Sequence, residues 1–329
     1  MFTPNNEDYT IIEVDTGNVC NLKCPDCNRQ DKEFKPLLRE KHFLGVGAFE
    51  LMIQKFPNVK RFFLGLMFDE PTLNPNILNI VKFLKQNDLA ITFNTNGNFK
   101  DYNLWTEILN QLRSEDRIVW SLDGLSNETY QEHRRNGNFF TVKDAIYFSA
   151  NYKSNLKNRP TNVIQIIKFK HNEEELNQHL DNFKRYHNIL WNKPVWDVIE
   201  SNGQCTIPTN KVQPTWDTKV QAKLKRTQSL YSETPMWKKC TKITNPKAKA
   251  LTLFISHTGV IGFCLPNLID NLKSDNPLLN ITYSIEAINA GIKEFHSYNK
   301  PASNKTCLFY CGKKSVLAKK AANLDYDIT

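Results

Sequence analysis

The sequence has no long apolar run. None of its segments approaches the roughly 18–20 consecutive apolar residues of a membrane-spanning helix. The first eight residues, Met1–Asp8, lack the basic stretch followed by an apolar one that marks a secretory signal. Internal repeats and low-complexity tracts are also absent. These absences argue against a membrane-spanning, secreted or repeat protein, and they predict a cytoplasmic globular one.

A concentrated basic block is also missing. The chain has 43 Lys and Arg against 34 Asp and Glu, a formal charge of +9, but the charge is spread along all 329 residues. A solvated surface therefore explains the excess better than a nucleic-acid-binding face does. The same excess is compatible with a phosphorylated or otherwise anionic substrate.

Cysteine is absent from the whole stretch between Cys27 and Cys205. The eight cysteines fall into a first group, a single residue that we interpret as a structural thiol, and a last group. These are Cys20, Cys24 and Cys27; Cys205; and Cys240, Cys264, Cys307 and Cys311. In a cytoplasmic chain, such clustering favours two metal sites over disulfide bonds.

Six segments are predicted to be β-strands, and most are followed by a helical pattern. The strands are expected at 11–16, 61–67, 89–94, 117–122, 162–169 and 194–199. The helices are expected at 47–56, 76–86, 102–113, 127–135, 142–152 and 173–187. This alternation predicts an α/β protein with a parallel sheet, a partial (β/α)6 TIM-like barrel, whose chemistry lies at the carboxyl ends of the strands.

Composition divides the chain into three parts. Residues 1–201 form the predicted barrel, and 202–239 read as a polar linker with a helix near 218–226. Residues 240–329 are expected to form a small C-terminal α+β domain that binds a metal cluster. It would consist of a β-hairpin over 251–264 and a helix over 285–295.

The first cysteine group has the spacing C-x3-C-x2-C and follows the first predicted strand. Three clustered thiolates favour soft metals or an iron–sulfur cluster. No histidine lies nearby to complete a closed zinc site, so three thiolates on a four-iron cluster would leave one iron open. A zinc knuckle that borrows a distant cysteine, and a set of plain buried thiols, remain the alternatives.

This spacing resembles the signature of the radical S-adenosylmethionine (radical SAM) superfamily. The resemblance implies a [4Fe–4S] cluster at Cys20, Cys24 and Cys27, whose open iron chelates the amino and carboxylate groups of S-adenosylmethionine. It also implies a TIM-like partial barrel, in agreement with the predicted elements.

Two segments after the second and third strands extend the resemblance. Phe68-Asp69-Glu70-Pro71 is similar to the family's Gly-Gly-Glu-Pro motif. Glu70 would there hold the amino group of the methionine moiety, while Phe68 and Asp69 depart from the glycines, so Asp69 itself could contribute. Asn94-Thr95-Asn96-Gly97 resembles the family's Thr-Asn-Gly segment, which implies that Asn94 and Asn96 line the cofactor pocket. A solvated acid and an ordinary turn are the plainer interpretations.

Ser121-Leu122-Asp123-Gly124 ends the fourth strand and matches the family's Ser-Leu-Asp-Gly. The match implies that Ser121 and Asp123 reach the ribose and carboxylate region. Arg134, preferred over Arg135, would pair with the methionine carboxylate through its planar guanidinium. A solvated helix face is the alternative for either arginine.

The last cysteine group resembles the C-terminal extension called SPASM, in its shorter form twitch. Gly259 precedes Cys264 in a G-x4-C step, Cys240 lies upstream, and Cys307 and Cys311 close with C-x3-C. The resemblance implies one auxiliary [4Fe–4S] cluster. A four-cysteine zinc site, and a cluster that Cys307 does not ligate, remain alternatives.

The implied reaction is reductive cleavage of S-adenosylmethionine to a 5′-deoxyadenosyl radical that takes a hydrogen atom from a substrate C–H bond. An auxiliary cluster would favour net oxidation, and a flavodoxin- or ferredoxin-type reductant is implied. We expect no built-in leader-binding domain, which favours a small molecule, or a peptide that is recognised directly. A SPASM-type peptide or protein maturase is the first alternative. A non-enzymatic zinc protein that binds nucleic acid is the second. The substrate and any general acid or base are not identified.

Overall fold

The computed structural model describes residues 5–25, 27–30, 32, 34–152, 158–200, 251–262, 272 and 280–296. Within them lies one mixed, mostly parallel sheet with the strand order β6-β5-β4-β3-β2-β1-β7-β8. Strands β1 to β6 follow one another in sequence order and every adjacent pair is parallel. This is the α/β arrangement that the alternating pattern predicts.

The six predicted strands and the six helices predicted between or after them are present, with ends displaced by a few residues. The strands are β1 Tyr9–Val14, β2 Arg61–Leu64, β3 Ala90–Thr95, β4 Arg117–Ser121, β5 Thr161–Lys168 and β6 Val195–Glu200. The α-helices are α1 Val46–Lys55, α2 Ile77–Gln86, α3 Tyr102–Gln111, α4 Asn127–His133, α5 Phe139–Asn151 and α6 Glu173–Leu190. The short 3-10 helices are η1 Asn6–Asp8, η2 Asn28–Gln30, η3 Lys35–Leu38 and η4 Pro71–Leu73.

The predicted hairpin is present and extends the sheet. Strand β7, Leu251–Ile255, lies parallel to β1, with Glu13 opposite Phe254. Strand β8, Ile261–Gly262, returns antiparallel to β7. The predicted helix is α10, Ile285–His296, and Asn289 Oδ1 accepts a hydrogen bond from the backbone N–H of Asn6 at 2.8 Å. The other parts of the predicted C-terminal domain, the linker at 202–239 and its helix near 218–226 lie outside the described residues.

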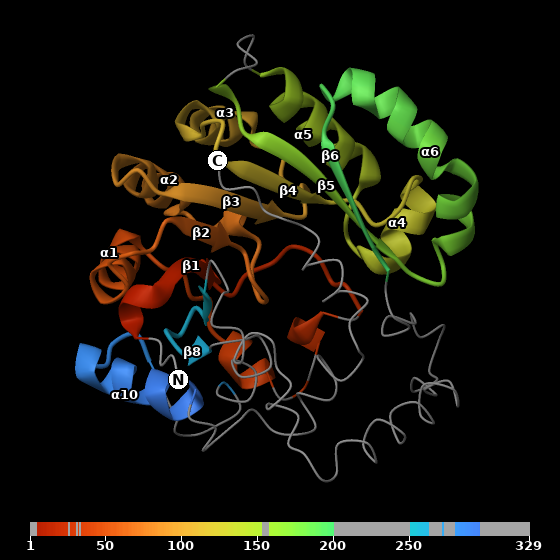
Figure 1. Ribbon diagram of the computed structural model, residues 1–329. Coiled ribbons are helices and arrows are strands. Elements are labelled where there is room, and N and C mark those ends of the chain that lie inside the picture. The colour runs from red at the N-terminus through yellow and green to blue at the C-terminus, as the bar shows by residue number, and fades with distance from the viewer. Residues whose placement is uncertain are drawn as a thin grey trace.

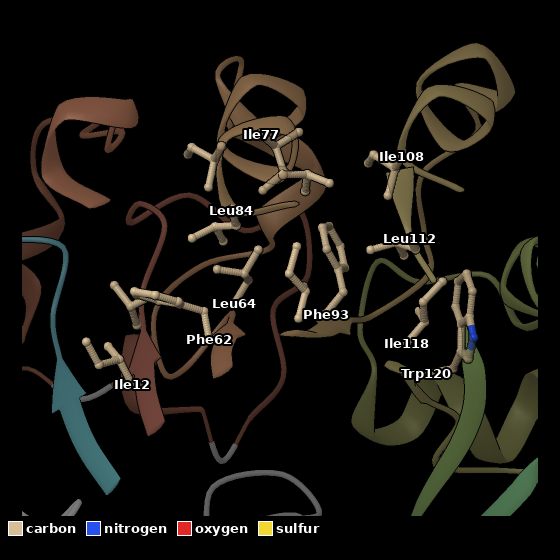
Figure 2. Packing of buried hydrophobic residues seen from close by; sticks show 14 of the residues in the cluster. Ile12, Phe62, Leu64, Ile77, Leu84, Phe93, Ile108, Leu112, Ile118 and Trp120 are labelled. Atoms are coloured by element: carbon tan, nitrogen blue, oxygen red, sulfur yellow. The ribbon is translucent and has the colours of Figure 1, made fainter. Parts of the chain in front are cut away.

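Alternation along each strand sets which side chains face the helices. In Arg61-Phe62-Phe63-Leu64, Phe62 and Leu64 are fully buried, while Arg61 and Phe63 are half-buried. Figure 2 shows Phe62, Leu64 and Phe93 of the strands packed toward Ile77 and Leu84 of α2. The face of the sheet that carries Arg61 and Phe63 is less buried than the face toward the helices. It is therefore the face on which a ligand can bind.

Helices cover one side of the sheet. In Figure 1, α1, α2, α3, α5 and α6 follow the outer side of the curved sheet, and the loop that succeeds β1 runs over the other side. The core between sheet and helices is one contiguous cluster that includes Ile12, Phe93, Trp105, Trp120 and Ile164. Within the described ranges, no helix is both long and apolar enough to cross a membrane.

Candidate active site

The three cysteines of the first group lie in the loop that follows β1. Cys20, Cys24 and Cys27 are free thiols, with Cys24 buried and the other two half-buried. Burial and the charge of Glu70 raise the pKa of Cys20 to about 12, and burial also raises the pKa of Cys24 and Cys27. Thiolates at these positions therefore need a positively charged partner, which a metal cluster provides.

Each cysteine contacts a group that a different part of the fold provides. Cys20 Sγ accepts hydrogen bonds from the backbone N–H of Leu22 at 3.5 Å and from Asn96 Nδ2 at 3.7 Å. Arg134 Nη1 lies 3.9 Å from Cys24 Sγ, and Cys27 Sγ lies 3.9 Å from the carbonyl of Met67. The ends of β2, β3 and α4 thus support the cysteine loop.

The donor set fits the implied iron–sulfur cluster. Across the described ranges, no three His, Cys, Asp or Glu side chains converge on a point where one metal ion would sit. The cysteine ligands of a [4Fe–4S] cluster bind different irons, so they need not converge on one point. Three half-buried or buried thiols on one loop are the ligands that such a cluster takes.

Arg29, which sequence reasoning missed, ties this loop to the loop after β2. Its Nη1 donates to the carbonyls of Asn18 and Phe68. The backbone N–H of Glu70 donates to Val19 O at 2.8 Å across the same junction. In the sequence, Arg29 is marked only by its place two residues after Cys27. That place does not reveal its contacts with Asn18 and Phe68.

The carboxyl group of Asp69 is occupied by hydrogen bonds from Thr16. Its Oδ2 accepts from Thr16 N at 2.8 Å and from Thr16 Oγ1 at 2.5 Å. Asp15 Oδ1 accepts from the backbone N–H groups of Met67 at 2.6 Å and Phe68 at 2.8 Å. The side chains of Asp15 and Asp69 are also in hydrogen-bonding contact with each other. The two acids therefore join the end of β1 to the loop after β2.

Burial raises the pKa of both acids. The pKa of Asp15 rises to about 6, and that of Asp69 rises well above its usual range because of burial and the neighbouring Asp15 charge. Among the described residues, no donor group reaches the buried oxygens Asp15 Oδ2 and Asp69 Oδ1. A proton shared between the two carboxyl groups satisfies this geometry. The predicted contact of Asp69 with S-adenosylmethionine stays a prediction.

Glu70 joins the loop after β2 to the end of β3. Its Oε1 accepts from Thr72 Oγ1 at 2.8 Å and Thr95 Oγ1 at 2.7 Å, and its Oε2 accepts from Asn96 N at 2.7 Å. Burial raises the pKa of Glu70, while these donors lower it. Glu70 thus holds in place Asn96, which contacts Cys20, and its predicted contact with an ammonium group stays a prediction.

The close approach of β2 and β3 is made by a glycine that the sequence argument did not single out. Gly65 has a φ of +87°, and a Cβ there would lie 2.9 Å from both Asn94 O and Pro71 Cγ. Asn94 Nδ2 donates to Gly65 O at 2.9 Å. Phe68, in contrast, is fully buried, and its ring lies 5.3 Å from that of Phe34. Where the family motif has a glycine that allows close backbone approach, this chain therefore has a side chain packed in the core.

Asp123 and Arg134, both predicted site residues, form a buried ion pair. Arg134 Nε and Nη2 each lie 2.6 Å from Asp123 Oδ2, and Ile167 N donates to Asp123 Oδ1 at 2.8 Å. His133, missed by sequence reasoning, has its Nε2 3.9 Å from the same Oδ2, and its ring lies 4.2 Å from that of Phe169 at a tilt of 30°. Burial and the adjacent Arg134 lower the pKa of His133 to about 4. The pair joins β4, α4 and β5 beside Cys24.

A polar row crosses the open face of the last three barrel strands. Ser121 of β4 is in register with Gln165 of β5, which is in register with Asp197 of β6. Gln165 Nε2 lies 3.5 Å from Asp197 Oδ2. Because Trp120, Ile164 and Trp196 at the alternate positions pack into the helix-covered core, this row lies on the other face. Of these three residues, the sequence analysis predicted only Ser121.

The second predicted cluster lies in a part of the chain that the structure does not describe. Cys240, Cys264, Cys307 and Cys311 lie outside the described residues, as does Cys205. The turn that leads toward Cys264 is described: Gly259 has a φ of +80°, and its backbone N–H donates to Ser256 O at 2.9 Å. The auxiliary site therefore stays a prediction.

Comparison with solved structures finds the same fold. SuiB from Streptococcus suis bound to S-adenosylmethionine aligns with a TM-score of 0.55 at 17% identity, over 88% of this chain and 68% of SuiB. SuiB bound to its precursor peptide SuiA aligns with a TM-score of 0.57 at 14% identity, over 88% and 67%. The protein anSMEcpe with bound AdoMet aligns with a TM-score of 0.51 at 14% identity, over 87% and 82%.

No curated protein sequence matches the chain. A family model described as the radical SAM superfamily matches residues 14–183, which is more than half of the chain and runs from β1 into α6. The match includes Cys20, Cys24 and Cys27 and the ends of β1 to β5. The chain belongs to the radical SAM superfamily, whose members use a [4Fe–4S] cluster and S-adenosylmethionine.

Proposed function

We propose that Cys20, Cys24 and Cys27 hold a [4Fe–4S] cluster and that the chain uses S-adenosylmethionine to abstract hydrogen from a substrate C–H bond. One observation carries the proposal: three free thiols lie on the loop after β1, and three separate parts of the fold support them. Membership of the radical SAM superfamily implies an enzyme. The alternative, a non-enzymatic zinc protein that binds nucleic acid, does not account for this membership.

When held by these cysteines, a [4Fe–4S] cluster with S-adenosylmethionine would supply 5′-deoxyadenosyl radical chemistry, given an electron from an external flavodoxin- or ferredoxin-type protein. The chain's own residues position them. Asn96 and Arg134 orient two of the cysteines, and Glu70 holds Asn96. The proposed lining of the cofactor pocket comes from the loops at the ends of β2, β3 and β4: Asp69, Glu70, Asn94, Asn96 and Ser121. The fold must also exclude water and other hydrogen donors around the radical.

We place the substrate on the open face of β4, β5 and β6. The row Ser121, Gln165 and Asp197 presents a hydroxyl, an amide and a carboxyl group in register on this face. Such groups fix a substrate by hydrogen bonds while an apolar wall excludes water. The proposed auxiliary cluster at Cys240, Cys264, Cys307 and Cys311 would accept an electron from the substrate radical, which favours net oxidation.

Iron content and nucleoside release test the proposal. The protein is purified without oxygen, reconstituted and assayed for iron, sulfide and 5′-deoxyadenosine after reduction with S-adenosylmethionine. We expect about eight irons for two clusters and about four after Cys20, Cys24 and Cys27 are replaced by alanine. Nucleoside release should disappear in that variant and persist in the control Cys205→Ala.

The other outcomes are distinct. About four irons with nucleoside release would support the first cluster and argue against the auxiliary one. Zinc without iron or nucleoside would overturn the proposal. Retention of nucleoside release in the triple variant would overturn the assignment of these three cysteines.

The substrate class has two candidates. A small, anionic molecule is compatible with the net charge of +9. A peptide is the second candidate, because one solved structure of this fold holds a precursor peptide. Incubation with pools of sugar phosphates, nucleotides or peptides distinguishes them: the pool that raises 5′-deoxyadenosine above the substrate-free background contains the substrate.

A further inference from the structure

The Arg134 guanidinium lies between Asp123 and Cys24. Two of its nitrogens, Nε and Nη2, are each 2.6 Å from Asp123 Oδ2, and the third, Nη1, is 3.9 Å from Cys24 Sγ. The side chain of Arg134 is 15% exposed and that of Asp123 is fully buried. All three nitrogens of the guanidinium are therefore directed at groups of the chain itself.

The position of this guanidinium is held from several directions. Ile167 N donates to Asp123 Oδ1 at 2.8 Å, and Asn172 Nδ2 donates to the Asp123 carbonyl at 2.9 Å. The backbone N–H of Lys23 donates to Arg135 O at 3.0 Å, which joins the cysteine loop to the end of α4. Moving Arg134 onto another anion would break a charge-assisted hydrogen bond and the ion pair, and it would leave a buried carboxylate unpaired.

The three cysteines differ in what donates to them. Cys20 accepts from neutral groups, the backbone of Leu22 and the amide of Asn96. In the described part of the chain, Arg134 is the charged side chain that hydrogen-bonds to a cysteine sulfur. A permanent positive charge beside a ligating sulfur stabilises the more negative, reduced state of an iron–sulfur cluster.

We propose that Arg134 acts through Cys24: its Nη1 donates to the Cys24 thiolate, raising the reduction potential of the first cluster, and Asp123 keeps it in place. This inference rests on the proposed function, because it needs the cluster. It assigns Arg134 a different role from binding the methionine carboxylate. No covalent step is involved, since the positive charge alters only the free energy of one-electron reduction at the cluster.

The reduction potential of the cluster is the direct readout. An EPR-monitored redox titration of the reconstituted protein identifies the first cluster as the one whose signal changes when S-adenosylmethionine is added. We expect Arg134→Gln to shift the midpoint potential to a more negative value while iron content stays at the parent level. Arg134→Lys keeps the charge and should recover part of the shift.

Arg135→Gln is the matched control, because Arg135 is the exposed neighbour of Arg134. Its midpoint potential should equal that of the parent protein. If Arg134→Gln fails to assemble the cluster because Asp123 is left unpaired, the double variant Asp123→Asn with Arg134→Gln removes both charges. A more negative potential in that variant supports the inference.

Two results would overturn the inference while leaving the proposed function intact. One is a fully loaded Arg134→Gln, or double variant, with the potential of the parent. The other is an unchanged potential with a weakened dissociation constant for S-adenosylmethionine, which would return Arg134 to the carboxylate-binding role. A parent protein that assembles no iron would instead be a failure of the proposed function, and the inference would fall with it.

Discussion

At the scale of single residues, the cysteine loop depends on buried acids that bind the groups contacting the cysteines. Glu70 and Asp123 each accept several hydrogen bonds from elements on either side of the site. Asp69 pairs with Thr16 and Asp15. Buried carboxylates with several donors have little conformational freedom. They therefore hold Asn96 and Arg134, the residues that contact the cysteines, in one arrangement.

The Asp15–Asp69 pair predicts a pH-dependent stability. Burial raises the pKa of Asp15 from 3.8 to about 6, and burial together with the Asp15 charge raises the pKa of Asp69 well above its usual range. The folded protein therefore retains protons that the unfolded chain has released. The free energy of unfolding should fall as the pH rises from 3.8 through about 6 and above.

Asp69→Asn tests this, because the amide keeps the shape of the side chain and removes the shared charge. Chemical unfolding of the cluster-loaded protein is measured between pH 5 and pH 8. Over this range the free energy of unfolding should fall less in the variant than in the parent, by about 1.4 kcal/mol for each pH unit of the pKa rise that the variant removes. The exposed Asp181→Asn is the control and should follow the parent. Parallel pH profiles for the parent and Asp69→Asn would contradict the shared-proton interpretation.

At the scale of elements, the end of β2 is shaped by one glycine. Gly65 has a φ of +87°, and a side chain there would meet Asn94 O and Pro71 Cγ at 2.9 Å. Pro71 begins η4 directly after Glu70. A change at Gly65 would therefore push the β3 end away from the loop that carries Glu70.

Gly65→Ala should destabilise the protein by about 1–3 kcal/mol, because alanine is strained at positive φ and the contact is short. It should also reduce the iron bound by the first cluster. The matched control is Gly47→Ala in α1, where a Cβ would meet only Glu50 Oε2 at 3.9 Å. A glycine inside a helix costs about 0.5–1 kcal/mol relative to alanine, so this control should be neutral or stabilising. Equal effects on unfolding and iron content would argue against the role of Gly65.

At the scale of the whole molecule, the cysteine loop links both halves of the sheet. Arg29 ties it to the loop after β2, Asn96 to β3 and Arg134 to the end of α4. On the other side of β1, β7 continues the sheet in parallel. A cluster bound to this loop would therefore stabilise contacts that span most of the described strands.

Removal of the first cluster should lower the Tm by roughly 5 °C or more, since a group that binds only the folded state adds its binding free energy to stability. Chelation of iron under anaerobic conditions, followed by circular dichroism melting, measures the change. The triple alanine variant of Cys20, Cys24 and Cys27 should start from a lower Tm and lose less on chelation. An unchanged Tm after complete iron removal from the parent would contradict this linkage.

The sequence by itself determined the order and type of the elements. Alternating apolar residues at period two, as in Arg61–Leu64, and amphipathic helices such as Ile77–Gln86 carry their own local signal. The cysteine spacing also predicted the first metal site, because its three thiols lie within one loop. These features depend on residues that are close in the chain.

Only the tertiary structure decided which groups the site residues contact. Asp69 meets Thr16 and Asp15, Arg134 meets Asp123 and Cys24, and Gln165 meets Asp197. The parallel arrangement brings the ends of distant strands together, and the partners of a buried charge depend on that geometry rather than on neighbours in sequence. The placement of β7 beside β1 likewise rests on pairing between segments more than two hundred residues apart.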